Sequence, residues 1–208
     1  MKQHPAKVFV IDDEEAVRDA IAMTLETVGL DYRLFASGSE FLQAFHSDWS
    51  GCVVLDIRMP GMSGLDLQRE LNARQVSLPV IFITGHGDIP MAVEAMRRGA
   101  IDFIRKPFRD QELLDRIQEA LQQDRQARET LTERQHLRER IAALTPRERE
   151  VFDRVAEGQA NKVIAIELGV SERTVEVHRA QVMKKLQAKS LAQLVRLKIE
   201  TEKDTKNL

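Results

Sequence analysis

Short apolar runs alternate with longer stretches of helical periodicity over the first 121 residues of the chain. The runs predict strands at about 7–11, 31–35, 51–55, 79–83 and 101–104. The periodic stretches predict helices at about 14–28, 38–47, 64–74, 88–98 and 110–121. Strands and helices that alternate in this way are typical of a parallel sheet covered by helices.

Five strands and five helices suit one known order of a doubly wound α/β fold. We expect the flavodoxin-like arrangement, in which the strands of the parallel sheet lie in the order 2-1-3-4-5. Ligands of such sheets bind in the crevice outside the carboxyl ends of the strands. Functional side chains are therefore expected at the ends of these strands.

A stretch rich in helix-forming residues follows the last predicted strand. Its sequence has no glycine between Gly99 and Gly158 and no proline between Pro107 and Pro146. We expect one helix from about 110 to 143, roughly 50 Å long at 1.5 Å per residue. Its apolar positions are too sparse for a continuous heptad, so a solvated, semi-rigid spacer is the interpretation for residues 122–143. A coiled-coil dimer is the alternative, because the apolar stripe is interrupted rather than absent.

The last part of the chain, residues 144–208, has an all-helical pattern. It predicts four helices, at about 146–157, 160–168, 172–186 and 191–199. Thr145 followed three residues later by Glu148 is a typical helix start, Gly169 forms a turn, and Ser171 caps the third helix. A short helix, a glycine turn and a longer helix make the helix-turn-helix pattern. The expected domains are thus 1–121 and 144–208, joined by the linker 122–143.

Charge and composition add a partner class and a compartment. Residues 1–121 carry 13 Lys and Arg against 19 Asp and Glu, whereas residues 145–208 carry 13 against 10. This asymmetry permits a nucleic-acid partner for the second part. There is no run of 18 apolar residues and no signal-peptide pattern, so we expect a soluble, cytoplasmic protein with no membrane partner. The single cysteine, Cys52, has apolar neighbours that favour a buried structural thiol.

Polar side chains close four of the five predicted strands. These side chains are, in chain order, Asp12 with Asp13, Asp56, Thr84 and Lys106. A single Asp after a strand is more often a helix cap or a turn former. Four such strand ends that meet at one edge of a sheet favour a functional site instead.

This set of groups suits phosphoryl transfer to a carboxylate. Crowded carboxylates repel one another, and a hard divalent cation, for which Mg²⁺ is the candidate, relieves the repulsion. Lys106 and Thr84 would supply a cation and a hydrogen bond to the phosphoryl oxygens, an electrostatic clamp on which this chemistry depends. Asp56 would then become an acyl phosphate.

With these residues, positions 5–121 resemble the receiver domain of two-component response regulators, and residues 83–96 resemble the FixJ branch in particular. The resemblance implies that Asp56 accepts phosphate from a sensor histidine kinase. It also implies that Asp13, the Asp56 carboxylate and the backbone carbonyl of Arg58 bind Mg²⁺, with Asp12 acting through metal-bound water.

The same resemblance implies a conformational switch and a dimer face. Thr84 and Phe103 match the switch pair of the family, and Lys106-Pro107 matches a position where a cis peptide bond is common. Val93 and Arg97 are spaced i and i+4 on the predicted helix at 88–98. They are our candidates for a two-fold contact that forms on phosphorylation.

Residues 144–197 resemble the LuxR-type DNA-binding domain. Val175, Val182 and Leu186 recur on one stripe of the third helix and are assigned to the core. Candidate groove contacts on the opposite face are Arg173, Glu176, Val177, Ala180 and Lys184. Candidate phosphate contacts are Lys162, Arg179, Lys185 and Lys189.

Three residues of the third helix leave alternatives open. Thr174 and His178 belong to the motif that carries the resemblance and are included in the candidate DNA interface. His178 either packs or binds DNA, and the packed role is favoured. Glu176 departs from the basic residue common in the family; it either accepts a hydrogen bond from cytosine or leaves that position unread.

These patterns together predict a phosphorylation-dependent transcriptional regulator without enzymatic turnover. Its expected partners are a sensor histidine kinase, promoter DNA, RNA polymerase and a second copy of the chain. A Mg²⁺-dependent phosphatase with an aspartyl intermediate is one alternative, but it would need a second carboxylate two residues beyond Asp56, where Arg58 stands. A phosphorelay or protein-interaction module that binds no DNA is the other, and the helix at 171–186 argues against it.

Overall fold

The computed structural model describes residues 6–85 and 89–206, so His86–Asp88 of the FixJ-like motif lie outside the described residues. The chain divides into two compact units, Met1–Arg128 and Glu129–Leu208. No helix among the described residues is long and apolar enough to cross a membrane.

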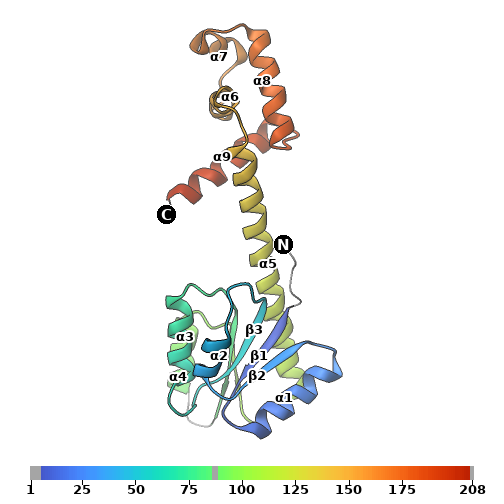
Figure 1. Ribbon diagram of the computed structural model, residues 1–208, viewed down its shortest axis with the longest axis vertical. Helices are drawn as coiled ribbons and strands as arrows, with labels where there is room; N and C mark the ends of the chain where they lie inside the picture. The colour runs from blue at the N-terminus through green and yellow to red at the C-terminus, as the bar shows by residue number, and fades with distance from the viewer. Residues whose placement is uncertain (1–5, 86–88, 207–208) are drawn as a thin grey trace. The chain divides into compact units, whose positions relative to one another are not determined.

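The first unit is built on a five-stranded sheet (Figure 1). Its strands are β1 (Lys7–Ile11), β2 (Tyr32–Phe35), β3 (Gly51–Asp56), β4 (Val80–Thr84) and β5 (Asp102–Arg105). All neighbouring strands pair in parallel. The strand order is β2-β1-β3-β4-β5, which confirms the order expected from the sequence.

Helices cover both faces of this sheet. They are α1 (Glu15–Thr27), α2 (Gly38–Ala44), α3 (Gly64–Ala73), α4 (Ile89–Arg97) and the long helix α5 (Asp110–Ala142). One core joins the sheet to α2, α3 and α4, and a second core joins it to α1 and α5.

The two cores follow from the alternation of side chains along the strands. In β1, Phe9 and Ile11 belong to the core under α2, α3 and α4, while Val8 and Val10 belong to the core under α1 and α5. Every residue of β3 is buried, as expected for a central parallel strand. Cys52 on β3 is buried, as the sequence predicts, and burial raises the pKa of its thiol.

The second unit is all-helical. It contains α6 (Pro146–Ala156), α7 (Asn161–Leu168), α8 (Glu172–Lys185) and α9 (Leu191–Lys206). Thr145 and Glu148 form the predicted capping box of α6, and the Ser171 side chain caps α8. Gly169 ends α7 in the left-handed conformation, with φ of 63°, a backbone conformation that favours glycine.

Helix α5 is continuous over 33 residues, which confirms the single long helix that the sequence predicts. The solvated spacer expected within it is only partly correct. Asp124 is 1% exposed and belongs to the first unit, while Leu137 and Ile141 are buried in the core of the second. Both ends of the segment 122–143 therefore contact a folded unit. Apolar periodicity could not reveal the first of these contacts, because Asp124 is a carboxylate.

Candidate phosphorylation site and nucleic-acid interface

The sheet brings the predicted reactive residues to one edge. Asp56 is the last residue of β3 and Thr84 the last of β4, while Asp12 and Lys106 directly follow β1 and β5. In the register of the sheet, Ile11 pairs with Leu55, immediately before two of these residues. All four groups thus lie at the carboxyl ends of parallel strands, where the sequence placed them.

Lys106 joins the two buried carboxylates of this edge. Its ammonium nitrogen lies 2.8 Å from Asp56 Oδ1 and 2.8 Å from Asp12 Oδ2. Asp12 is 0% exposed and Asp56 is 5% exposed, so their charges have little contact with water. The shared cation offsets the repulsion between them, as a charge-assisted hydrogen bond does in a site of low dielectric.

The ionisation of the pair reflects this environment. Burial raises the pKa of Asp56 above its ordinary value, although the hydrogen bond and charge of Lys106 act in the opposite direction. Burial lowers the pKa of Lys106, but hydrogen bonds and charge from Asp56 and Asp12 outweigh burial and raise it. The lysine is therefore held as a cation.

Backbone donors fix the remaining carboxylate oxygens. The Arg58 amide donates to Asp56 Oδ2 at 2.6 Å, and the Glu14 amide donates to Asp12 Oδ1 at 2.9 Å. The guanidinium of Arg18 donates to the Asp12 carbonyl at 2.7 Å. Sequence reasoning missed Glu14 and Arg18, because both follow the strand end and read as ordinary helix charges.

Gly64, the first residue of α3, lies directly against the end of β3. Its amide donates to the Ile57 carbonyl at 2.9 Å, and a Cβ built on Gly64 would stand 2.2 Å from the Asp56 carbonyl oxygen. Any other residue would push α3 away from β3. The close approach fixes α3 beside Asp56.

The expected metal ligands have the donor types that suit a divalent cation. Carboxylates and a backbone carbonyl are the oxygen donors that Mg²⁺ prefers, so the donor types of Asp12, Asp13, Asp56 and Arg58 fit the ion. Asp13, however, is exposed, and the described part of the chain contains no group of three acidic, His or Cys side chains that could hold a metal. The crowding of three carboxylates that the sequence suggested is replaced by two carboxylates that share Lys106.

The predicted switch and dimer residues occupy different environments. Thr84 is buried, and its carbonyl accepts a hydrogen bond of 2.7 Å from the Lys106 amide. Phe103 on β5 is 41% exposed, and Val93 on α4 is 46% exposed. Arg97, one turn after Val93, is exposed as well. The Lys106-Pro107 bond is cis, as the resemblance implies.

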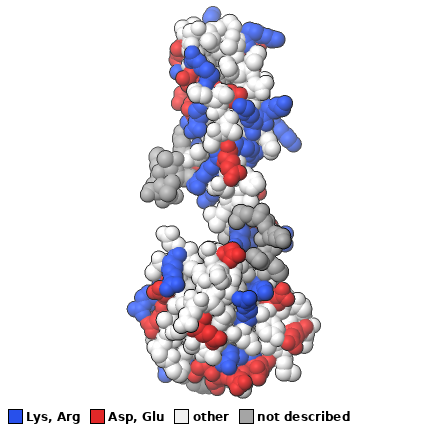
Figure 2. Space-filling model, in the orientation of Figure 1, with Lys and Arg blue, Asp and Glu red and all other residues white. Residues whose placement is uncertain are grey.

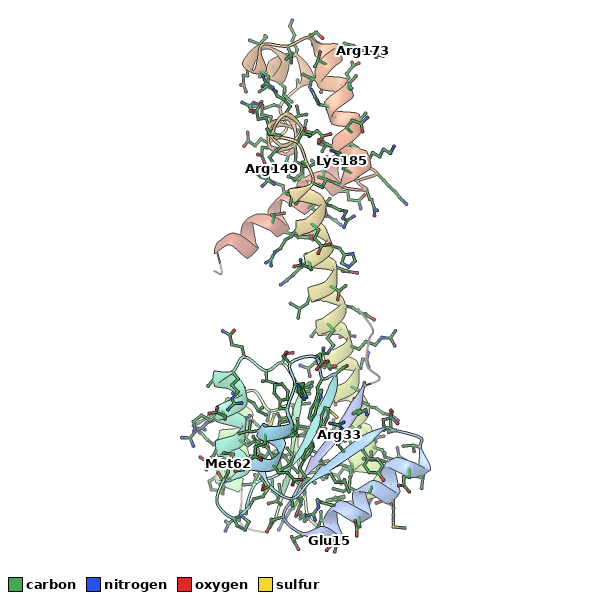
Figure 3. All side chains as sticks on the ribbon, in the orientation of Figure 1. Glu15, Arg33, Met62, Arg149, Arg173 and Lys185 are labelled. Carbon is green, nitrogen blue, oxygen red and sulfur yellow. The ribbon has the colours of Figure 1, made fainter. Side chains whose placement is uncertain are left out.

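Helix α8 has a buried stripe on one side and a solvent-exposed face on the other, as expected. Val175, Val182 and Leu186 are buried in the core of the second unit. The exposed residues of the helix include all five candidate groove contacts, Arg173, Glu176, Val177, Ala180 and Lys184. Figure 2 shows Lys and Arg side chains gathered along the side of this unit that α8 forms, and Figure 3 shows Arg173 and Lys185 at its opposite ends.

The remaining candidates lie at the margins of this face. Lys162 and Lys189 are exposed, while Thr174, His178 and Arg179 are half-buried. The Arg179 guanidinium donates to Asn161 Oδ1 at 3.0 Å, which ties α8 to the start of α7.

Lys185, one of the candidate phosphate contacts, has partners inside the second unit. Its ammonium lies 2.6 Å from Glu148 Oε2 and 3.2 Å from the Ala143 carbonyl, inside the second unit. The hydrogen bond from Lys185 and the backbone hydrogen bond from Thr145 lower the pKa of Glu148. Lys185 thus joins the end of α8 to the start of α6, a role that spacing on α8 alone could not reveal.

Each of the two units matches a known protein family. Residues 8–118 match the response regulator receiver domain, and residues 142–198 match the bacterial regulatory proteins of the luxR family. The chain belongs to the response regulators that combine a receiver domain with a LuxR-type DNA-binding domain.

Relatives match over nearly the whole chain. Nodulation protein W of Bradyrhizobium diazoefficiens is 48% identical over 92% of this chain and 85% of its own length. Transcriptional regulatory protein FixJ of the same organism is 45% identical over 91% and 93%. The solved structure of response regulator StyR superposes with a TM-score of 0.85 at 44% identity, covering 93% of this chain and 98% of that one.

The family defines the activity in general terms. The protein is a phosphorylation-dependent transcriptional regulator, and the family implies a sensor kinase and promoter DNA as its partners.

Proposed function

We propose that Asp56 is the residue that receives the phosphoryl group from the sensor histidine kinase. Its carboxylate stands at the carboxyl edge of the sheet with Oδ1 held by Lys106 and Oδ2 by the Arg58 amide. This position, at the end of the buried central strand, is the observation that carries the proposal. Lys106 and Thr84 would bind the oxygens of the added phosphoryl group.

We further propose that Mg²⁺ assists this transfer. Asp13, Asp56 and the Arg58 carbonyl would hold the ion, and Asp12 would act through water. The bound ion would supply positive charge to the phosphoryl oxygens. Calorimetric titration of the unphosphorylated protein with MgCl₂ tests this assignment, because Asp13→Asn should weaken the binding whereas Asp31→Asn, at an exposed position before β2, should not.

The protein is proposed to act stoichiometrically rather than as a phosphatase. Two residues beyond Asp56 stands Arg58, which has no carboxylate to act as the acid and base for turnover. Phosphorylated protein should therefore lose its phosphate slowly and should not hydrolyse other phosphoesters.

The exposed face of α8 is the proposed reading surface for promoter DNA. Arg173, Glu176, Val177, Ala180 and Lys184 would face the bases in the major groove. Phosphates would be bound by Lys162, Arg179 and Lys189, with Thr174 and His178 at the margin of the contact. The hydrogen bond of Arg179 to Asn161 would orient the guanidinium toward the phosphate backbone of the DNA.

Phosphorylation is proposed to act by assembling a homodimer. Thr84 would move toward the phosphoryl group, and the exposed ring of Phe103 would turn into the vacated space. The surface of α4 that carries Val93 and Arg97 would then pair with a second copy. Two DNA-binding domains would bind neighbouring half-sites and recruit RNA polymerase to the promoter.

Acetyl phosphate labelling in the presence of Mg²⁺ tests the phosphoacceptor directly. Wild-type protein should incorporate phosphate, and Asp56→Asn should incorporate none, because an amide is a poor nucleophile. Asp31→Asn is the matched control, since this exposed acidic residue precedes β2 and does not belong to the carboxyl edge of the sheet. Equal labelling of the wild type and Asp56→Asn would reject the assignment.

A further inference from the structure

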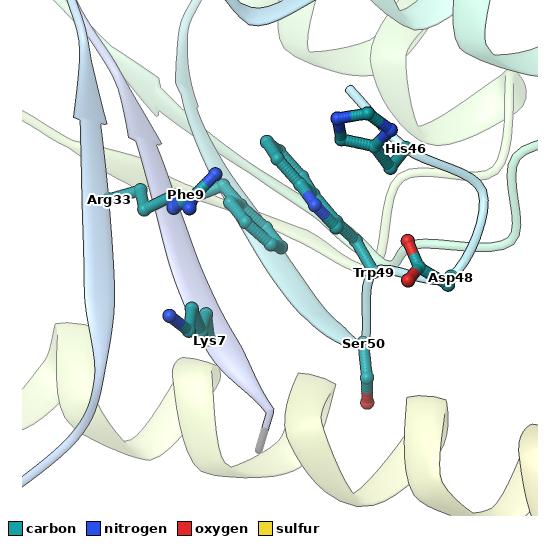
Figure 4. Close-up of a pocket in the computed structure, with 7 residues that line it drawn as sticks. All are labelled: Lys7, Phe9, Arg33, His46, Asp48, Trp49 and Ser50. Atoms are coloured by element: carbon teal, nitrogen blue, oxygen red, sulfur yellow. The ribbon is translucent and has the colours of Figure 1, made fainter. Parts of the chain in front are cut away.

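A cavity lies at the opposite end of the sheet from Asp56. It has a volume of about 300 Å³, at the lower end of the range for small-molecule sites. Its lining residues are Lys7, Phe9, Arg33, His46, Asp48, Trp49 and Ser50 (Figure 4). Lys7 begins β1 and Ser50 directly precedes β3, so the cavity belongs to the amino-terminal edge of the strands.

One wall of the cavity is a fixed aromatic surface. The rings of Trp49 and Phe9 are stacked, with their centres 4.5 Å apart and their planes 6° from parallel. Phe9 is buried in the core, so it holds the indole in place from behind. The His46 ring lies 6.1 Å from the indole on another side.

Two cations border this surface. The guanidinium carbon of Arg33 lies 5.0 Å from the centre of the Trp49 ring, and Lys7 stands on the neighbouring strand. Within the described ranges 6–85 and 89–206, neither Lys7 nor Arg33 has a carboxylate at ion-pair distance. Asp48 is the one acidic residue of the lining, so the cavity has an excess of positive charge.

The wall is also fixed from below by α5. Ser50 Oγ and the Gly51 amide donate to Asp124 Oδ2 at 2.8 and 2.9 Å, and Arg128 donates to the Trp49 carbonyl. Arg128 in turn pairs with Asp124 at 2.9 Å. The cavity is therefore preformed, and a ligand in it would pay little reorganisation free energy.

We propose that this cavity binds a small molecule that combines a flat ring with an anionic group. The ring would pack on the indole of Trp49, and the anion would lie between Lys7 and Arg33. These two cations have no paired carboxylate in the part of the chain that the structure describes, which favours a negative ligand. The site is separate from the phosphorylation chemistry, since none of its lining residues belongs to the edge that carries Asp56.

The fluorescence of Trp49 gives a direct test, because it is the single tryptophan of the chain. Full-length protein is titrated with benzoate and with adenosine monophosphate, which carry a carboxylate and a phosphate respectively. We expect a saturable change with at least one of them, and the tighter of the two identifies the preferred anion. Acetate, which lacks the ring, and benzamide, which lacks the charge, should give no saturable change. Titration calorimetry with the same compounds separates binding from collisional quenching.

Two variants assign the binding to this cavity. Lys7→Gln and Arg33→Gln should each weaken binding of the active probe by about tenfold or more. Arg109→Gln, at an exposed position outside the cavity, and Asp56→Asn should bind it as the wild type does. The proposal is overturned if neither probe binds, if benzamide binds as tightly as benzoate, or if both Lys7→Gln and Arg33→Gln leave binding unchanged.

Discussion

Lys106 and Asp56 form an ion pair of 2.8 Å at the carboxyl edge of the sheet. Asp56 ends β3, whereas Lys106 follows β5, far along the sequence. The same ammonium holds Asp12 at 2.8 Å. A phosphoryl group on Asp56 would add negatively charged oxygens beside this ammonium group. Lys106 would therefore be in direct electrostatic contact with the added charge. The ion pair thereby connects Asp56 to the end of β5, the strand that carries Phe103.

Replacing Lys106 should shift the pH dependence of phosphorylation. The proposed nucleophile is the ionised carboxylate of Asp56, so labelling should fall as the pH drops through the pKa of Asp56, which burial raises. Lys106→Met removes the group that opposes this rise and should move the labelling midpoint to higher pH. Labelling rates with acetyl phosphate measured across pH give the midpoint, and Arg109→Gln is the control. A midpoint that moves to lower pH in Lys106→Met would contradict the geometry.

The raised pKa of Asp56 has a matching effect on stability. A pKa that is higher in the folded than in the unfolded state means that protonation favours folding. This contribution is present at low pH and is lost as the pH rises through the folded pKa. Asp56→Asn should therefore make the free energy of unfolding of the receiver less dependent on pH in this window, as urea titrations at several pH values would reveal. An unchanged pH dependence would count against burial as the cause.

Adjacent lysines at the end of α8 should have different roles. Lys185→Ala should destabilise the second unit by about 1 kcal/mol, because it removes a hydrogen bond to the buried Glu148 carboxylate. Lys184→Ala should leave stability unchanged and should reduce the salt dependence of binding to a mixed-sequence DNA duplex by about one unit. Urea unfolding and fluorescence anisotropy measure the two effects. The reverse result, with Lys184 stabilising and Lys185 setting the salt slope, would refute this division.

The pair of Lys185 and Glu148 also predicts a pH effect. The pKa of Glu148 is lowered in the folded state, so its contribution to stability is present above the unfolded pKa. It is lost as the pH falls through the folded pKa. The destabilisation caused by Lys185→Ala should accordingly shrink in acid, and a constant difference from the wild type at all pH values would exclude the ion pair as its origin.

The end of α5 should be required for a stable DNA-binding fragment. A fragment of residues 129–208 keeps Leu137 and Ile141, which are buried in its core, whereas a fragment of residues 144–208 loses both. The shorter fragment should be less stable by at least about 2 kcal/mol, the lower range for removing a buried aliphatic side chain. Denaturant unfolding of the two fragments compares them. Equal free energies of unfolding would show that Leu137 and Ile141 do not stabilise this core.

The face of α4 should control assembly. Val93→Asp places a charge on a half-exposed apolar position, and we expect at least about tenfold weaker dimerisation after activation with beryllofluoride. Met23→Asp on α1 is the matched control, because Met23 is an exposed apolar residue of another helix. Light scattering measures both. Normal dimerisation of Val93→Asp would move the interface away from α4.

Local patterns were sufficient to predict the strand order, the positions of the polar strand ends and the buried stripe of α8. Alternation in β1 and helical spacing in α8 depend on residues close in sequence, which a pattern can reveal. Asp124 and Lys185 could not be placed in this way. Each is a charged residue in a helix rich in charges, and its partner lies 73 or 37 residues away. The aromatic wall at Trp49 likewise exists only once β1 lies beside the loop before β3.

A phosphoryl group on Asp56 should increase the affinity of the protein for DNA. Fluorescence anisotropy with a duplex selected from a random pool by the 129–208 fragment measures this change. Wild-type protein treated with acetyl phosphate and Mg²⁺ should bind this duplex at least about tenfold more tightly than untreated protein, since a dimer engages two half-sites. Asp56→Asn should show no gain. An equal gain in Asp56→Asn, or none in the phosphorylated wild type, would contradict the account.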